Sequence, residues 1–214
     1  MRKSERYDGI IKYFSEHKPD AETELIYTDP YQLAVAVLLS AQCTDKRINL
    51  VTPAFFKKYP DSAGLAKAKQ EDIYTLISSV TYPNNKSKLL IGMAEMLTGT
   101  YHGIMPSDVN ELQKLPGIGR KSANVLASVI YNKPAMAVDT HVFRVAERIG
   151  LTTNSKTPLQ TELELVRNIP EHLIPQAHHW LILHGRYVCK ARNPKCGECG
   201  IASFCRFFSK AGTK

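Results

Sequence analysis

The stretch Leu115-Pro-Gly-Ile-Gly-Arg-Lys-Ser-Ala123 contains two glycines and lies between two predicted helices. The first helix is expected over Val109 to Leu115, because it has a capping-box-like start and ends at a Pro-Gly pair. The second helix is expected to begin near Arg120. Gly117 and Gly119 allow a tight turn and expose consecutive N–H groups at the N-terminus of the second helix. The stretch therefore predicts a hairpin of two helices.

Two phosphate-binding motifs have a similar composition, and the stretch matches neither of them. A dinucleotide fingerprint needs G-x-G-x-x-G after a strand, whereas this chain has Ser122 at the last glycine position and no predicted strand. A P-loop needs Gly directly before Lys-Ser, where this chain has Arg120. Two interpretations stay open: a turn whose N–H groups hold a phosphate without sequence preference, and a plain turn without a ligand.

Helical periodicity dominates the rest of the chain, and strand signals are nearly absent. A broad apolar stripe runs from Tyr31 to Leu50, which we predict to be one buried helix with Pro30 at its start. Another helix is expected to begin after Asp139 and to end before Gly150. The remaining helices are expected over residues 52–60, 63–80, 86–98 and 176–187. The predicted fold class is all-α.

Composition restricts the kind of protein that this chain can be. It has 214 residues, of which 43% are hydrophobic and 22% charged, so disorder and a disulfide miniprotein are disfavoured. The densest apolar run, Leu33 to Leu39, is far shorter than the ~20 residues that cross a bilayer. Because the first residues also lack an apolar secretory segment, we expect a cytosolic protein without a membrane partner.

Basic residues outnumber acidic ones by 28 to 20, and the formal net charge is +8. Such a charge attracts polyanions, and most of the excess lies after Arg186. Nucleic acid is therefore the leading class of partner, and a protein that is merely basic is the alternative.

Four of the five cysteines fall into one short segment with the spacing C-x6-C-x2-C-x5-C. They are Cys189, Cys196, Cys199 and Cys205. A disulfide framework is disfavoured for a cytosolic chain of this size. Four-cysteine zinc sites usually pair two C-x2-C knuckles across ~15 to 20 residues, so this spacing favours an iron-sulfur cluster over zinc. Cys43 lies in the predicted apolar helix and is expected to be a small buried hydrophobe.

A metal bound by these cysteines would also hold the loop between the first two of them. That loop carries Lys190, Arg192 and Lys195, which would meet DNA phosphates from a rigid backbone. The alternative is a solvated basic segment that happens to contain metal ligands.

Taken together, several blocks resemble the helix-hairpin-helix DNA glycosylases of the endonuclease III type. They are the turn stretch quoted above, the cysteine segment, Ala137-Val-Asp-Thr-His141, Leu38-Leu-Ser-Ala-Gln-Cys-Thr-Asp45 and His178-His-Trp-Leu-Ile-Leu-His-Gly-Arg186. The resemblance covers nearly the whole chain and implies two α-helical lobes with a groove for DNA between them. One would be a helical barrel domain over residues 24–133, with the helix-hairpin-helix at about 109–128. The other would combine residues 1–23 and 134–214 and hold a [4Fe-4S] cluster in the loop 189–205.

By this resemblance, Lys121 is the nucleophile and Asp139 is its acidic partner. An amine that attacks the sugar C1′ displaces the damaged base and leaves an imine, which acidifies C2′ so that β-elimination can break the strand. Asp139 would stabilise positive charge that develops on the sugar and help to move protons. Residue type alone favours the alternative, in which Lys121 is a surface or phosphate-binding lysine and Asp139 only a helix N-cap, because such residues are common.

An enzyme that acts on a base in a duplex must rotate the nucleotide out of the stack. The resemblance identifies Gln42 as the residue that enters the space left behind. The wedge loop of such enzymes commonly has Gly followed by an apolar or aromatic residue, whereas this chain has Thr81 at the glycine position and Pro83 nearby. The candidate for the wedge is Tyr82.

Three functions are consistent with these residues and motifs. The resemblance implies a bifunctional base-excision repair enzyme, with glycosylase and abasic-site lyase activity, that removes oxidised pyrimidines from double-stranded DNA and acts as a monomer. The alternatives are a non-catalytic iron-sulfur DNA-binding module and a monofunctional adenine glycosylase of the same superfamily. The adenine glycosylases usually lack a lysine at the position of Lys121 and carry an extra C-terminal domain.

Overall fold

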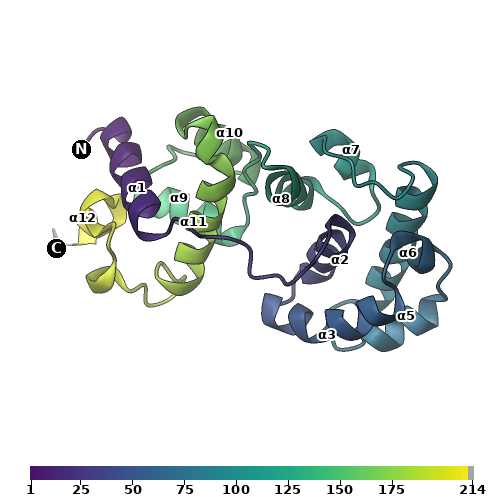
Figure 1. Cartoon of the computed structure of the whole chain (residues 1–214). Helices are drawn as coiled ribbons and strands as arrows, with labels where there is room; N and C mark the ends of the chain where they lie inside the picture. Colours follow the sequence, from purple (N-terminus) through teal and green to yellow (C-terminus); the bar gives the residue numbers. More distant parts are fainter. Residues whose placement is uncertain (212–214) are drawn as a thin grey trace. The chain divides into compact units, whose positions relative to one another are not determined.

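Helices and the loops between them make up the whole of the described chain (Figure 1). The computed structural model describes residues 1–211, and within that range it has twelve α-helices, three short 3-10 helices and no strand. The all-α prediction is confirmed. The chain divides into two compact units, one of residues 24–131 and one that combines residues 1–23 with the chain from residue 132 onward. None of the helices within residues 1–211 combines the length and apolar character that a membrane span requires.

The unit of residues 24–131 is built around one buried helix. Its helices are α2 (Pro30–Ser40), α3 (Asp45–Lys58), α4 (Ser62–Ala66), α5 (Gln70–Ile77), α6 (Pro83–Gly99), α7 (Val109–Lys114) and α8 (Arg120–Tyr131). In α2, the residues from Leu33 to Leu39 are all buried, and the helix packs against α3, α6 and α8. A helix that is apolar on every side belongs in a core, so α2 sets the centre of this unit.

The prediction of one helix from Tyr31 to Leu50 is wrong. The helix ends at Ser40, and a new helix, α3, starts at Asp45 after a short turn. Gln42 has a left-handed backbone with φ 56°, which interrupts the helix, and the Thr44 hydroxyl caps the N-terminus of α3. The apolar stripe continues across the break because both helices bury residues in the same core, so periodicity alone did not reveal it. Residues 52–58 are the second half of α3 and not a separate helix.

The segment 63–80 also holds two helices where one was predicted. Helix α4 begins after Asp61, whose carboxylate accepts the Gly64 N–H at 2.7 Å, and it ends after one turn. Helix α5 follows after Lys69. Helix α6 begins at Pro83, earlier than expected, because Pro suits the first position of a helix.

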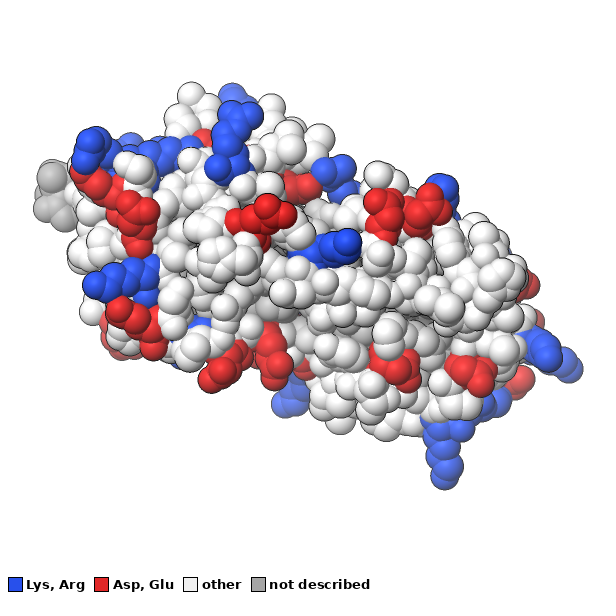
Figure 2. Space-filling view, turned by 45° about the horizontal axis from the view of Figure 1, so that its top comes forward, with Lys and Arg blue, Asp and Glu red and all other residues white. Residues whose placement is uncertain are grey.

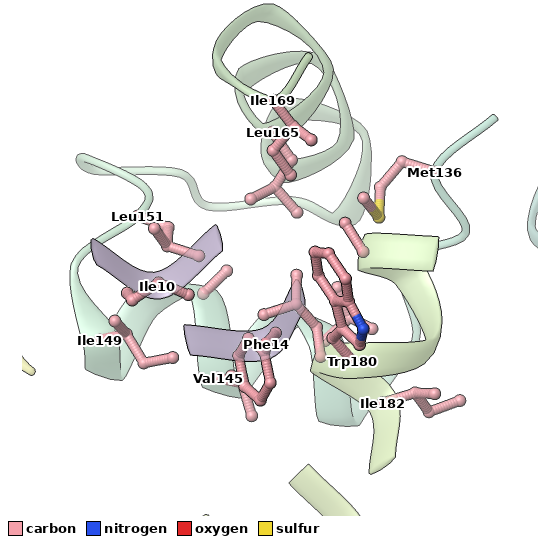
Figure 3. Packing of buried hydrophobic residues seen from close by; sticks show 14 of the residues in the cluster. Ile10, Phe14, Met136, Val145, Ile149, Leu151, Leu165, Ile169, Trp180 and Ile182 are labelled. Atoms are coloured by element: carbon pink, nitrogen blue, oxygen red, sulfur yellow. The ribbon is translucent and has the colours of Figure 1, made fainter. Parts of the chain in front are cut away.

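The unit that contains both chain ends has a second core. Its helices are α1 (Lys3–His17), α9 (Thr140–Ile149), α10 (Pro158–Asn168), α11 (Ile174–Tyr187) and α12 (Arg206–Ala211), with 3-10 turns at Glu171–Leu173, Cys196–Glu198 and Ala202–Phe204. Phe14 of α1 stacks on Trp180 of α11 with ring centroids 5.8 Å apart (Figure 3). The Trp180 indole N–H also donates to the Lys18 carbonyl at 2.8 Å. The N-terminal helix is thus part of the core that the C-terminal half forms.

Candidate nucleic-acid interface and iron-sulfur site

The turn between α7 and α8 has the geometry that its sequence predicts. Pro116 and Gly117 occupy the two central positions, and the Ile118 N–H donates to the Leu115 carbonyl at 3.0 Å. Gly117 has φ 82°, as the third residue of a type II turn requires. A Cβ atom on Gly117 would lie 2.8 Å from Cδ1 of Leu38, which is too close. Packing and backbone conformation therefore both require glycine at this position.

Gly119 has a different environment, although the sequence pairs it with Gly117. A Cβ atom on Gly119 would meet no other atom within 4 Å, and its φ is not in the left-handed region. The open space lies at the N-terminus of α8, where the first N–H groups of a helix have no partner within the helix. This arrangement agrees with a backbone that an anion can approach closely.

Lys121 and Asp139 lie at the beginnings of two helices, α8 and α9, in different units. Lys121 is in the first turn of α8 and is exposed. Oδ1 of Asp139 accepts hydrogen bonds from the N–H groups of His141 and Val142, each at 2.8 Å. Asp139 is therefore the N-cap of α9, and Oδ2 stays available for another group. Held by two short bonds, the carboxylate has a defined orientation.

Three of the predicted DNA-binding residues line one cavity of about 410 Å³ in the unit of residues 24–131. They are Gln42, Tyr82 and Gly117, and the apolar residues Leu38 and Leu89 also line the cavity. Gln42 and Tyr82 have left-handed backbones with φ 56° and 54°, and the side chain of Tyr82 is 64% exposed. The structure thus brings together residues that are 75 positions apart in the sequence (42 and 117).

Lys86 lines the same cavity, and sequence analysis did not identify it as a functional residue. It is buried at 4% exposure, and its ammonium group donates to the carbonyl oxygens of Leu39 and Ala41. Burial lowers the pKa of Lys86 from its ordinary value. Lysines are mostly exposed, and nothing in the sequence near Pro83 indicates that Lys86 is buried. Only the fold reveals its burial.

The four clustered cysteines line a second cavity, in the other unit. Its wall contains Cys189, Cys196, Cys199 and Cys205 together with apolar residues that include Ile149, Ile201, Phe207 and Phe208. Burial raises the pKa of the Cys196 and Cys199 thiols, and the other cysteines nearby raise them further. Four thiolates in one apolar pocket need several positive charges to balance them, as an iron-sulfur cluster provides.

A single metal ion fits these cysteines less well than a cluster does. Within residues 1–211, no three His, Cys, Asp or Glu side chains are close enough together to hold one ion. Thiolates that bind four separate iron atoms of a cluster lie farther from one another than thiolates around one zinc ion at about 2.3 Å. Four cysteines that line one cavity without forming a single-ion group therefore fit a cluster.

Cys43 is not the buried hydrophobe in a helix that the sequence predicts. It lies in the turn between α2 and α3 and is partly exposed. The error has the same origin as the predicted helix from Tyr31 to Leu50, because the turn at Gln42 moves this residue out of the core.

The basic loop between Cys189 and Cys196 is fastened to α9 by protein groups. The guanidinium of Arg148 donates to the carbonyl oxygens of Lys190 at 2.7 Å and of Ala191 at 2.9 Å. The three predicted DNA-binding cations of this loop are all exposed: Lys190, Arg192 and Lys195. On the face drawn in Figure 2, basic side chains are interspersed with acidic ones, so the net charge of the chain does not mark a binding surface there.

Family models and solved structures with known functions match this chain. The model of the HhH-GPD superfamily of base excision DNA repair proteins matches residues 35–171, and the model of the iron-sulfur binding domain of endonuclease III matches residues 189–205. Endonuclease III of Rickettsia felis is 44% identical over 200 residues, which cover 94% of this chain and 93% of the relative. Endonuclease III of Escherichia coli is 37% identical over 98% of this chain and 99% of the relative.

The fold is also that of endonuclease III bound to DNA. A trapped endonuclease III–DNA covalent intermediate, an estranged-adenine complex, matches with a TM-score of 0.92 at 38% identity, covering 99% of this chain and 100% of the other. A non-covalent endonuclease III–DNA complex matches with a TM-score of 0.93 at 37% identity, with complete coverage of both chains (100% each). From its sequence and its fold over nearly the whole length, the chain belongs to the HhH-GPD superfamily of base excision DNA repair proteins and, within it, to the endonuclease III family.

Proposed function

We propose that this chain removes oxidised pyrimidines from duplex DNA and then cuts the strand, with the amine of Lys121 as the nucleophile. The chain is a DNA-binding base-excision repair glycosylase with abasic-site lyase activity, and it carries a [4Fe-4S] cluster. The match to a trapped covalent intermediate carries the proposal, because a covalent bond to DNA requires a nucleophile on the protein. Lys121 offers an exposed amine one residue after the start of α8. The two alternative functions are not favoured.

The Lys121 amine attacks C1′ of the damaged nucleotide, and the bond to the base breaks with the electron pair leaving on the base. Loss of a proton from the nitrogen and opening of the sugar give an imine. The imine acidifies C2′, so that loss of a C2′ proton expels the 3′ phosphate by β-elimination. Asp139 supports both steps, because its Oδ2 can stabilise the developing positive charge and carry a proton while Oδ1 holds the cap.

Gln42 and Tyr82 fill the space that the damaged nucleotide leaves. Both residues line the cavity beside the helix-hairpin-helix turn, and Tyr82 presents a large exposed ring that can stack on a base. The backbone at Gly117 and Gly119 binds a phosphate of the same strand through N–H groups at the N-terminus of α8.

The ligands of the cluster are the four cysteines that line the second cavity, Cys189, Cys196, Cys199 and Cys205. When bound, the cluster supplies a rigid cross-link for the loop that holds Lys190, Arg192 and Lys195, and these cations contact phosphates. We expect Cys196→Ser to lower the iron content and the brown absorbance near ~410 nm, and Cys43→Ser to leave both unchanged. Equal iron in the two variants would remove Cys196 from the ligand set.

The two units correspond, in this proposal, to the two lobes that the family resemblance implies, with the helical barrel over residues 24–133 and the cluster lobe in the remainder. The enzyme acts as a monomer on double-stranded DNA that contains damaged bases or abasic sites. In this proposal the place of action is the cytoplasm, at the nucleoid in a prokaryotic cell.

Borohydride reduction of the imine tests the nucleophile. The holoenzyme is mixed with a duplex that contains an abasic site, treated with borohydride and separated on a denaturing gel. We expect a covalent protein–DNA band for the wild type and none for Lys121→Gln, whereas Lys114→Gln, at an exposed lysine of α7, should keep the band. An undiminished band with Lys121→Gln would exclude this lysine as the nucleophile.

A further inference from the structure

A compact set of hydrogen bonds surrounds the ammonium group of Lys86, in the first turn of α6. Its Nζ donates to the Leu39 carbonyl at 2.8 Å, to the Ala41 carbonyl at 2.6 Å and to the Thr81 hydroxyl at 3.2 Å. Because an ammonium group has three N–H donors, these three acceptors can use all of them. A lysine that is only 4% exposed therefore has its hydrogen bonds satisfied inside the protein.

The acceptors also suit a positive charge. Leu39 lies in the last turn of α2, and Ala41 is the C-cap of that helix, so their carbonyl oxygens form the negative end of the helix dipole. Burial lowers the pKa of Lys86, whereas the helix end favours the charged form. The α2 terminus is thus closed by a side chain from another helix, and not by a glycine as is common.

Thr81 extends this set of bonds to the loop before α6. Its Oγ1 lies 3.2 Å from the Ala41 carbonyl oxygen and 3.0 Å from the Gln42 carbonyl oxygen, to which it donates, and it accepts from Lys86. Thr81 is the residue that replaces the glycine common at this place in similar enzymes. The Thr81 hydroxyl connects the loop before α6 with the turn after α2. A glycine has no hydroxyl, so the common pattern lacks this connection.

Each of the two residues proposed to enter the duplex directly follows a residue of this network. Gln42 follows Ala41 and Tyr82 follows Thr81, and both have left-handed backbones with φ 56° and 54°. Such a conformation is unfavourable for residues other than glycine and persists only where the surroundings hold it. The network supplies that restraint on both sides of the cavity.

We infer that Lys86 and Thr81 are positioning residues, which hold Gln42 and Tyr82 in one arrangement before the damaged nucleotide leaves the duplex. The inference rests on the proposed function, in which Gln42 and Tyr82 enter the space that the nucleotide leaves. Two loops that are already ordered lose less conformational entropy when they enter DNA. The network therefore lowers the barrier to base extrusion and not the barrier to chemistry at C1′.

Fluorescence of 2-aminopurine next to an oxidised pyrimidine measures the extrusion step, because the signal rises when its stacking neighbour leaves the helix. The holoenzymes compared are the wild type, Thr81→Val and Lys86→Met. We expect the fluorescence rise to slow by at least about 10-fold in both variants, as the loss of a hydrogen bond to a charged group predicts. Cleavage of a preformed abasic site, which has no base to extrude, should slow by less than about 3-fold.

Matched controls separate the effect of a lost hydrogen bond from the effects of a lost charge and of a changed side-chain volume. Thr81→Ser and Lys86→Arg keep the donors and should restore most of the wild-type rate. Lys88→Met removes one positive charge from an exposed position of the same helix and should leave the rate unchanged. Urea unfolding establishes that each variant is folded. Because Thr81 is exposed, Thr81→Val tests the inference even if Lys86→Met does not fold.

A variant with both Gln42→Ala and Tyr82→Ala separates a failure of the positioning role from a failure of the insertion role in the proposed function. If this double variant extrudes the base at the wild-type rate, the insertion role of Gln42 and Tyr82 is wrong. If the double variant is slow while folded Thr81→Val is as fast as the wild type, the positioning role is wrong. If both are slow, Thr81→Val should add nothing in the double-variant background, because it acts through the two missing side chains.

Discussion

Gly117 shows at the scale of a single residue how two physical requirements coincide. The turn needs φ 82°, which is costly for any residue with a Cβ, and a Cβ would also lie 2.8 Å from Leu38. We therefore expect Gly117→Ala to lower the free energy of unfolding by about 2–4 kcal/mol, from the backbone cost and the overpacking together. Urea unfolding measures this change.

Gly119→Ala is the matched control for that experiment. The added methyl group would meet no atom within 4 Å, so the free energy of unfolding should change by less than about 1 kcal/mol. A reduced affinity for undamaged duplex in this stable variant would support close approach of a phosphate to the backbone. Equal destabilisation by the two substitutions would contradict the different roles given to the two glycines.

His179 makes stability depend on pH. Burial lowers its pKa from 6.5 to about 4. Below pH 6.5 the unfolded chain takes up a proton that the folded chain does not, so the free energy of unfolding falls as the pH decreases toward 4 and is fully kept above 6.5. We expect His179→Gln to reduce this slope by up to about 1.4 kcal/mol per pH unit.

Urea unfolding at several pH values between the two pKa values measures the slope for each protein. His172→Gln changes an exposed histidine in the same region and should leave the slope as in the wild type. An unchanged slope in His179→Gln would mean that this histidine titrates in the folded protein as it does in the unfolded chain.

At the scale of an element, the carboxylate of Asp139 caps α9, and we propose that the same carboxylate takes part in the chemistry. Asp139 caps the helix through Oδ1, and Asn at the same position would keep that hydrogen-bond acceptor. We expect Asp139→Asn to keep the wild-type stability and Asp139→Ala to lose about 1 kcal/mol. Both variants should release the damaged base much more slowly, because both lack the carboxylate.

Urea unfolding and single-turnover base release on the same preparations separate the two tasks. Wild-type base release by Asp139→Asn would show that the cap is the whole contribution of this residue. A loss of stability in Asp139→Asn as large as in Asp139→Ala would show that the cap needs the charge.

At the scale of the whole molecule, a net charge of +8 does not say where DNA binds. We expect replacement of Lys190, Arg192 and Lys195 by Ala to weaken binding to all duplexes alike. The slope of log K against log salt should flatten by up to about 0.9 for each phosphate contact that is lost. Fluorescence anisotropy at several salt concentrations measures this slope.

A control variant removes three exposed lysines elsewhere, Lys12, Lys67 and Lys156, and therefore the same amount of charge. Its slope should stay close to that of the wild type, because a lysine that contacts no phosphate releases no counterion. The same flattening in both variants would mean that the loop between Cys189 and Cys196 does not contact DNA directly.

The sequence correctly predicted those features that depend only on a few neighbouring residues. The turn at Pro116-Gly117, the N-cap Asp139 and the helix end at Gly150 are all present in the structure, because turn geometry and capping depend on neighbouring residues only. The spacing of the four cysteines likewise predicted a cluster site, since ligands that are close in sequence can reach one cavity without help from the rest of the fold.

Tertiary structure alone revealed the break in the helix at Gln42, the partial exposure of Cys43 and the burial of Lys86. The apolar stripe of α2 and α3 looks the same for one helix as for two that share a core, so only packing exposes the turn. The ammonium of Lys86 reaches a carbonyl 47 residues earlier in the chain. Burial of a charge is favourable only when distant groups satisfy it, and no local pattern records which distant groups the fold brings near.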